Sequence, residues 1–178
     1  MAGRFVRSVV VLVLAAIAPV GGHAQSAPAG ESRTIYLVRH ADKVNDDVDA
    51  PLNDAGRVRA ECLADTLRDA KIQQIFTSDL RRTQQTAAPL AARLQLKPVA
   101  IPLATPDALV KAIQSSTAPS VLVVWHDATL PGILRQLGAP EIAPITHMEY
   151  DRFFVLTLSG SGAGTRVGFA ALRYCGAR

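Results

Sequence analysis

The sequence predicts an α/β fold, a sandwich of helices around a largely parallel β-sheet. Short apolar runs alternate with longer segments of helical composition through most of the chain. Strands that alternate with helices are joined by crossover connections, and these favour parallel pairing. Two of the apolar runs also end directly in histidine, at His40 and His126. Ligands of open α/β sheets bind beyond the carboxyl ends of the strands, so this repetition indicates where a site would lie.

The first residues have the pattern of a secretory signal peptide. Arg4 and Arg7 precede an apolar run at residues 9–18, and Ala24 fits a cleavage site. An apolar run of about ten residues is short for a bilayer span, which needs ~20. We therefore expect residues 1–24 to be a signal peptide, with an uncleaved membrane anchor as the alternative. The mature protein is then expected to be periplasmic or secreted and free of the membrane.

The remainder of the chain is predicted to be one domain. Residues 25–33 are rich in Ala, Ser, Gly and Pro and predict a flexible leader, and residues 34–178 have the usual size of a single domain. The 19 basic and 15 acidic residues give a net charge of +4. Two of the basic residues lie in the predicted signal peptide, so the remaining chain has a net charge of +2. Because the basic residues are scattered and aromatic residues are few, nucleic-acid binding is not expected. The sequence gives no indication of an oligomeric state.

The predicted elements follow one another in a regular order. They are a strand at 34–38, a helix at 54–67, a strand at 72–77, a helix at 80–94, a strand at 97–101, a helix from 105, a strand at 120–125, a helix at 130–137, and a hairpin of 153–158 with 167–172. We expect Pro89 to interrupt or kink its helix, and Thr105 to cap the next helix with its hydroxyl. Gly138 is expected to end the helix at 130–137.

The helix at residues 54–67 is predicted to be amphipathic. Its periodicity places Val58, Cys62 and Thr66 on one stripe, with Leu63 and Leu67 beside it. Cys62 has a single possible partner, Cys175, and an oxidising compartment would allow a disulfide to persist. The sequence leaves open whether the two cysteines pair or remain separate thiols.

Four basic side chains are candidates for one cationic pocket: Arg39, His40, Arg82 and His126. Arginine grips phosphate oxygens bidentately, and imidazole donors add to the neutralisation of a phosphoryl dianion. A neutral His40 nitrogen would then attack phosphorus, and the leaving alkoxide would need a proton donor. Asp127 is the first candidate for this donor and Asp42 the second.

These residues belong to four ordered motifs. Arg39-His40-Ala41 follows the first strand, and residues 51–60 have the pattern Pro-Leu-x-x-x-Gly-x-x-x-Ala. Residues 78–87 have the pattern Ser-x-Leu-x-Arg-x-x-x-Thr-Ala, and an apolar strand leads into His126. In this arrangement the chain resembles the histidine phosphatase superfamily, the group that includes phosphoglycerate mutases and histidine acid phosphatases.

The resemblance implies a phosphoglycerate mutase-like fold, a three-layer α/β/α sandwich around a mostly parallel mixed sheet. It also implies a phosphomonoesterase that hydrolyses phosphate esters through a phosphohistidine on His40. Arg39 and Arg82 would bind the phosphoryl group, with Asp42 assigned to substrate binding as well. The resemblance implies neither metal nor organic cofactor. The glutamate motif that supplies the acid in mutases is missing after Arg82, which favours hydrolysis of a small-molecule phosphate ester over mutase chemistry.

Two other classes of function remain open at this stage. Trp125 stands where the family has glycine, and its ring would either narrow the pocket or pack in the core. In the first case the domain would bind a phosphate or phosphosugar without turnover. A metal-dependent hydrolase is the second alternative, because His40, Asp42, His126 and Asp127 are all possible ligands. Two arginines converging on the same place argue against it.

Overall fold

The computed structural model describes residues 32–160 and 164–176. Its elements are β1 (Ser32–Arg39), α1 (Asp54–Thr66), β2 (Gln74–Ser78), α2 (Arg81–Leu94), β3 (Val99–Ile101), α3 (Pro106–Ser115), β4 (Ser120–Trp125), α4 (Leu130–Gln136), β5 (Arg152–Ser159) and β6 (Arg166–Arg173). The predicted signal peptide lies outside the described residues, as does the predicted leader up to residue 31. β1 begins two residues before the predicted strand.

The strands form one mixed sheet in the order β3-β2-β4-β1-β5-β6. The pairs β2·β3, β2·β4 and β1·β4 are parallel, whereas β5 pairs antiparallel with β1 and β6. β1 and β4 are therefore neighbours at the centre of the sheet, with all six residues of β4 buried. The predicted α/β sandwich with a mostly parallel sheet and a C-terminal hairpin is confirmed.

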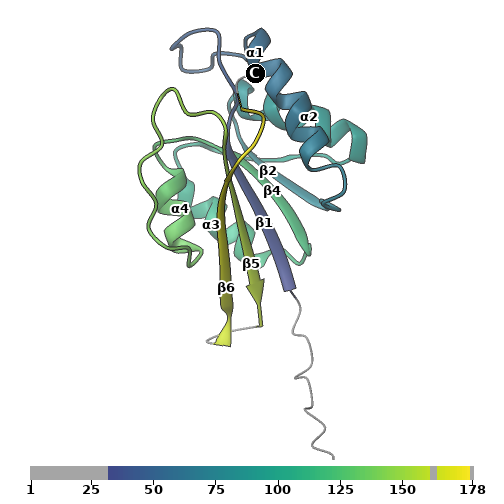
Figure 1. The fold of residues 1–178 in the computed structure, drawn as a ribbon, viewed down its shortest axis with the longest axis vertical. Coiled ribbons are helices and arrows are strands. Elements are labelled where there is room, and N and C mark those ends of the chain that lie inside the picture. Colours follow the sequence, from purple (N-terminus) through teal and green to yellow (C-terminus); the bar gives the residue numbers. More distant parts are fainter. Residues whose placement is uncertain (1–31, 161–163, 177–178) are drawn as a thin grey trace, which may run out of the picture.

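Helices cover both faces of the sheet, which gives three layers (Figure 1). Alternate residues of the strands point to opposite faces, so each strand feeds two cores. On one face Leu37 and Val123 pack with residues of α3 and α4, among them Leu109 and Leu134. On the other face the core contains residues of α1 and α2 together with Val124. None of the described helices has the length and apolar character that crossing a membrane requires.

The buried face of α1 differs from the stripe indicated by the sequence. Its buried residues are Gly56, Ala60, Leu63 and Ala64, whereas Val58 is 70% exposed. The face that meets α2 is built largely from small residues, because small side chains allow two helices to approach closely. Hydrophobicity alone does not identify such a face.

Gly56 lies where α1 passes closest to the loop that follows the first histidine. The Asn53 side chain caps α1 by accepting from the amide of Gly56, and the Asn53 amide donates to the carbonyl of Asp42. A Cβ atom on Gly56 would overlap this same Asp42 carbonyl. The glycine of the Pro-Leu-x-x-x-Gly motif therefore permits backbone contact between α1 and the loop at residues 41–53.

α2 is one helix through Pro89, so the interruption given as one alternative there is wrong. The expected cap of α3 is also wrong. Thr105 is the N-cap residue of α3, but its hydroxyl donates to the carbonyl of Pro102 instead of capping the helix. The end of α4 is close to the predicted one, since the helix ends at Gln136 and Gly138 follows with a φ of 89°.

A disulfide joins Cys62 on α1 to Cys175 beyond β6, with the two Cα atoms 6.1 Å apart. The bond crosses 113 positions of sequence and fixes the C-terminal segment against α1. Arg59 reinforces this junction, because its Nη1 donates to the carbonyl of Cys175 at 2.8 Å. Its Nε donates to Asp42 at 2.7 Å. The alternative that the sequence left open is thereby resolved in favour of pairing.

The close approach at Gly56 predicts a large difference between two helical glycines. Gly56→Ala is expected to destabilise the protein by about 3 kcal/mol, the upper part of the range for overpacking, because rigid backbone lies opposite the new methyl group. Gly132→Ala in α4 is the matched control, since its Cβ would meet nothing within 4 Å, and it should be neutral or stabilise by up to ~1 kcal/mol. Denaturant unfolding of both variants measures this, and equal stabilities would contradict the assignment.

Candidate functional site

The two strand-terminal histidines lie side by side at the carboxyl ends of β1 and β4. Arg39 pairs in register with Trp125, and the backbone amide of His40 donates to the carbonyl of Trp125 at 2.9 Å. The rings of His40 and His126 have centroids 5.2 Å apart. The two strand-ending histidines therefore lie at one edge of the sheet, where the sequence indicates a site.

Trp125 does not narrow this site. Its side chain is fully buried in the core beside α3 and α4. His126 follows the last residue of β4, and its ring meets the Trp125 ring edge-on, with centroids 5.7 Å apart. The large ring in place of glycine therefore belongs to the core, and it is not among the residues that line the cavity at the histidines.

That cavity has a volume of about 350 Å³. Basic side chains dominate its lining, with one carboxylate and one leucine among them. The lining residues are Arg39, His40, Lys43, Arg82, Leu103, His126, Asp127, Ala128, Thr129 and His147. The cavity thus has the charge that a phosphoryl dianion requires, and it includes five of the six residues that the sequence singles out.

His40 is held in one tautomer. Its Nδ1 lies 2.9 Å from the carbonyl oxygen of Ala41, and because a carbonyl only accepts, Nδ1 carries the proton. The imidazole is buried, and burial lowers its pKa to about 3 despite the opposing effect of that hydrogen bond. The charges of His126, Arg39 and Arg82 contribute to the same lowering of the pKa. At neutral pH the ring is therefore uncharged, with a lone pair on Nε2.

His126 begins a chain of hydrogen bonds that runs into β2 and α2. Arg82 Nη2 lies 3.3 Å from Nδ1, which must accept, so Nε2 carries the proton and donates to Ser78 Oγ at 2.8 Å. Ser78 in turn donates to Thr83 Oγ1, whose own proton goes to the carbonyl of Leu80. Burial is the main cause that lowers the pKa of His126 to about 4. This histidine too is neutral at physiological pH.

Arg82 enters the cavity from the first turn of α2, whereas Arg81 is exposed. Its Nη1 donates to the carbonyl of Val48 at 2.6 Å, and its Nη2 faces His126. Among the described residues nothing accepts from its buried Nε–H. The motif that distinguishes Arg82 from its neighbour therefore agrees with the position of its side chain.

Arg39 is the most extensively bound residue of the site, and it is 2% exposed. Its Nη1 donates to the carbonyls of Thr146 and His147 at 2.9 and 3.0 Å, and to that of Glu149 at 3.3 Å. Its guanidinium carbon lies 4.1 Å from the ring centroid of Tyr150. Its Nε–H, like that of Arg82, has no acceptor in the described part of the chain.

The two candidate carboxylates have different positions. Asp127 lines the cavity, with Oδ2 at 3.0 Å from Arg39 Nη2 and Oδ1 accepting from the amide of Ala128. It does not cap α4, whose N-cap residue is Thr129. Asp42 instead forms an ion pair with Arg59 at 2.7 Å and is not part of the cavity lining. The structure therefore brings Asp127, but not Asp42, to the two histidines.

The sequence reasoning missed three contributions to the site. His147, which no sequence motif singles out, lines the cavity, and its Nδ1 lies 3.5 Å from Asp127. Tyr150 packs on Arg39 and lies near the ring of His40. Ser78 was placed only as the first residue of a motif. His147 and Tyr150 lie in a segment without periodicity, so no local pattern reveals them.

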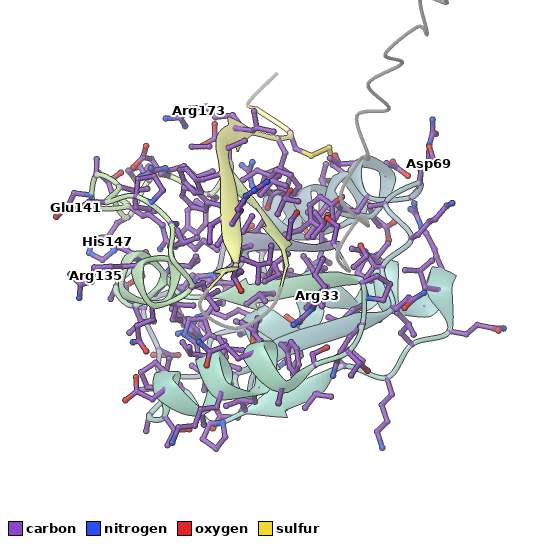
Figure 2. The ribbon with its side chains drawn as sticks, turned by 90° about the horizontal axis from the view of Figure 1, so that it is seen from below. Arg33, Asp69, Arg135, Glu141, His147 and Arg173 are labelled. Atoms are coloured by element: carbon purple, nitrogen blue, oxygen red, sulfur yellow. A yellow bond between two sulfur atoms is a disulfide. The ribbon has the colours of Figure 1, made fainter. Side chains whose placement is uncertain are left out.

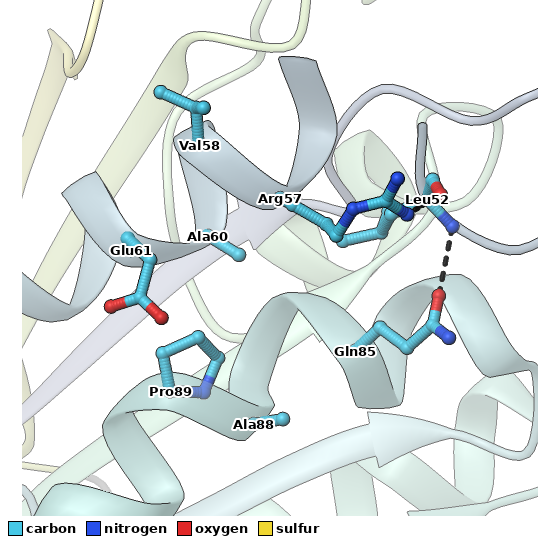
Figure 3. A pocket seen from close by; sticks show the side chains of 8 residues that line it. All are labelled: Leu52, Arg57, Val58, Ala60, Glu61, Gln85, Ala88 and Pro89. Carbon is cyan, nitrogen blue, oxygen red and sulfur yellow. Dashed lines mark hydrogen bonds between the residues drawn. The ribbon is translucent and has the colours of Figure 1, made fainter. Parts of the chain in front are cut away.

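A larger groove lies elsewhere, between α1 and α2. It has a volume of about 520 Å³ and includes Leu52, Val58, Gln85 and Pro89 in its lining (Figure 3). Gln85 accepts from the amide of Leu52 across its floor. It contains none of the predicted site residues, so size alone would point to the wrong surface, and the side-chain chemistry identifies the smaller cavity as the candidate site.

The four residues considered as metal ligands do not converge. Asp42 faces Arg59, and Asp127 faces Arg39. Within the described ranges, no three His, Cys, Asp or Glu side chains lie close enough together to hold a metal ion. The donor set at this site is therefore that of an anion-binding cavity.

Comparison with known proteins agrees with the motifs. The model of the histidine phosphatase superfamily (branch 1) matches residues 35–103, which include His40 and Arg82. The chain is thus similar to this superfamily over residues 35–103. The chain is 37% identical over 71 residues to a Schizosaccharomyces pombe protein named as a probable phosphatase, a match over 36% of this chain and 32% of that protein. It is 37% identical over 67 residues to phosphoglycerate mutase-like protein 4 of Arabidopsis thaliana, over 33% of this chain and 29% of that protein.

These matches span about a third of each curated relative, whereas structural similarity covers most of the described domain. A mycobacterial glucosyl-3-phosphoglycerate phosphatase in complex with inorganic phosphate superposes with a TM-score of 0.61 at 18% identity, over 78% of this chain and 95% of that chain. The protein histidine phosphatase SixA complexed with tungstate gives 0.56 at 20% identity, over 79% and 96%. At these identities the similarity establishes the fold alone, which this chain shares with those two phosphatases.

The lowered pKa values of the two histidines predict an acid-sensitive stability. The ordinary pKa of a histidine is 6.5, whereas the folded protein lowers it to about 3 for His40 and about 4 for His126. Below pH 6.5 the unfolded chain therefore binds more protons than the folded chain, and the free energy of unfolding decreases as the pH falls. His40→Asn retains an N–H for the Ala41 carbonyl but does not titrate. Between pH 6 and 4 the unfolding free energy of this variant should therefore fall less steeply than that of wild type. The two slopes should differ by about 1.4 kcal/mol per pH unit, the value for one proton. Denaturant titrations across this range test it, and parallel profiles would argue against a neutral buried His40.

Proposed function

We propose that the protein is a phosphomonoesterase that hydrolyses small-molecule phosphate esters through a phosphohistidine on His40. The observation that carries this proposal is the pairing of a nucleophile with an anion site. His40 has its proton fixed on Nδ1 and therefore a lone pair on Nε2. Beside it, Arg39 and Arg82 line the same cavity, and each has a buried Nε–H that no described residue accepts. Buried donors require partners, and phosphoryl oxygens are suitable acceptors for both.

In the first step the lone pair of His40 Nε2 attacks phosphorus and the bond from phosphorus to the ester oxygen breaks. Arg39 and Arg82 would neutralise the charge that spreads over the phosphoryl oxygens in the transition state. The Ala41 carbonyl stabilises the positive charge that develops on the imidazole, because it remains the acceptor of the Nδ1 proton. Water then attacks the phosphohistidine, which releases phosphate and restores the neutral ring.

His126 would support the phosphoryl group together with Arg82. In the structure Arg82 donates to His126 Nδ1. If Arg82 turns towards a phosphoryl oxygen, this nitrogen becomes free to take a proton, and a nearby dianion favours the charged imidazole. Ser78 would hold the ring in place throughout, because it binds the opposite nitrogen.

Proton transfer to the leaving oxygen is proposed to occur on the Asp127 side of the cavity. Asp127 is at the cavity wall, whereas Asp42 is engaged by Arg59 on the far side of its loop. The role that we assign to Asp42 is structural: its ion pair and its carbonyl contact near Gly56 position the loop after His40. Among the relatives, the mycobacterial protein is named for a sugar phosphoglycerate and SixA for phosphohistidine in a protein. The substrate of this chain is left at the level of a phosphate ester.

Binding without turnover is the second candidate function, and its main support is weakened by the structure. It depends on Trp125 closing the approach to His40, and this side chain is fully buried in the core. A cavity of about 350 Å³ remains open over His40. The geometry therefore favours catalysis over a non-catalytic phosphate site.

We also propose that the protein is exported to the periplasm or secreted. The pattern of residues 1–24 supports this, and so does the Cys62–Cys175 disulfide, because such bonds persist in oxidising compartments and are rare in the cytosol. A crosslink between residues 113 positions apart also stabilises a small domain, because it restricts the unfolded chain.

Phosphatase activity is tested with the mature chain and 4-nitrophenyl phosphate in the presence of a chelator. Wild type should turn over, and His40→Asn should lose at least about 10³-fold in kcat because the covalent route is closed. Rapid acid-free quenching with radiolabelled substrate should trap an acid-labile, base-stable phosphoenzyme in wild type only. Arg81→Gln, an exposed neighbour of Arg82, is the control and should retain activity. Phosphate binding with no turnover in wild type would instead support the binding module.

Export is tested by expressing the chain with and without residues 1–24 in a Gram-negative bacterial host. The full-length chain should reach the periplasm, start at Gln25 and resist thiol alkylation, since its two cysteines are paired. The truncated chain should remain in the reducing cytosol with both thiols reactive. Cytosolic retention of the full-length chain with free thiols would contradict export.

A further inference from the structure

His147 lies at the rim of the cavity on the segment that connects α4 to β5. It lines the cavity with His40 and Arg82, and its Nδ1 is 3.5 Å from Asp127 Oδ2. Its side chain is 96% exposed, so the ring is free to turn towards a substrate that projects out of the cavity. Figure 2 shows it at the surface of the molecule, on the same side as Glu141.

The backbone at this position is nevertheless fixed. Arg39 Nη1 binds the carbonyls of Thr146 and His147 itself, and Glu149 accepts from the amide of Thr146 at 2.9 Å. The same guanidinium lines the proposed phosphoryl site, so the Cα of His147 is held at a set position relative to that site. His147 therefore combines a fixed backbone with a mobile ring, which suits a residue that contacts the leaving group of a phosphate ester.

The other groups of the cavity are poorly placed to supply a proton. Asp127 accepts at both oxygens, from Arg39 at Oδ2 and from the Ala128 amide at Oδ1. The single N–H of neutral His40 is bound by a carbonyl, and that of His126 is bound by Ser78. Lys43 donates its ammonium to Asp46 at 2.8 Å. Among the described residues, the His147 ring has no such partner besides Asp127.

We propose that His147 is the general acid and base of the reaction, and that Asp127 acts as a positioning residue that orients its imidazole. This inference rests on the proposed phosphatase function. With Nδ1 directed at Asp127, Nε2 of the imidazolium is free to face the leaving oxygen. As His40 Nε2 bonds to phosphorus and the ester bond breaks, the leaving oxygen takes the Nε2 proton of His147. In the second step the neutral His147 removes a proton from the attacking water while the phosphorus–nitrogen bond breaks, and it returns to its starting state.

The experiment compares substrates whose leaving groups differ in their need for a proton. For His147→Gln, kcat/KM with an alkyl phosphate such as glycerol 2-phosphate should fall by about 10²-fold or more, because general acid catalysis contributes that much to a poor leaving group. With 4-nitrophenyl phosphate, whose leaving group departs as an anion, it should change by no more than about threefold. The quantity kcat/KM includes only steps up to phosphoryl transfer, so hydrolysis of the phosphoenzyme does not obscure the comparison.

Met148→Gln is the matched control, since this neighbour is 87% exposed and does not line the cavity; both substrates should be unaffected. Asp127→Asn should show a smaller loss that is again selective for the alkyl phosphate, which a purely structural role would not produce. Equal losses of His147→Gln on both substrates, or none on either, would overturn the proposal. A selective loss in Asp127→Asn with none in His147→Gln would make Asp127 the donor. Failure of wild type to turn over either substrate would instead reject the phosphatase function itself.

Discussion

The ion pair and hydrogen bonds of Arg39 organise the site, because they join three parts of the chain that are distant in sequence. The guanidinium leaves the end of β1, forms an ion pair with Asp127 after β4, and binds carbonyls of the segment before β5. It is almost fully buried, and a buried charge is tolerated only when it is compensated. The Asp127 carboxylate and the carbonyl dipoles supply that compensation. One residue therefore both supplies positive charge to the cavity and fixes the loop that carries His147 and Tyr150.

The electrostatics of the cavity explain how a histidine can act as a nucleophile there. Two arginines and a second imidazole surround His40, and burial in their company disfavours its protonated form. In the function that we propose, the same charges would attract a phosphoryl dianion, and His40 would stay neutral until the substrate arrives with compensating charge. The hydrogen-bond chain through Ser78 and Thr83 acts in parallel by fixing the tautomer of His126. A main-chain carbonyl thus selects the tautomer of His40, whereas Arg82 and Ser78 together select that of His126.

The sequence allowed prediction of the features that depend on strands and ordered motifs. Two apolar runs that end in histidine indicated the edge of the sheet at which His40 and His126 lie, and the motif at residues 78–87 indicated Arg82. Features that depend on tertiary packing were not predictable. The face of α1 that packs on α2 consists mainly of glycine and alanine, which carry little hydrophobic signal.

His147 illustrates the same limit within the site. It is placed by carbonyl oxygens that bind Arg39, and backbone carbonyls leave no trace in the sequence. The role of Asp42 was obscured for a related reason. Its nearness to His40 in sequence suggested the cavity, but Arg59, one turn into α1, draws its carboxylate the other way. The partner of a charged side chain is decided by packing, and only the folded chain shows which of several opposite charges is within reach.

The contacts of Arg59 also connect the stability of the fold to the geometry of the site. This arginine holds the Asp42 carboxylate with Nε and the Cys175 carbonyl with Nη1, while the disulfide fixes Cys175 to the same helix. Asp42 lies two residues after His40, and its carbonyl is closely packed at Gly56. The C-terminal end of the domain therefore supports the loop that follows the nucleophile, although no residue of that end lines the cavity. An oxidised pair of cysteines maintains this support, which gives the disulfide a part in positioning His40 in addition to its effect on the unfolded chain.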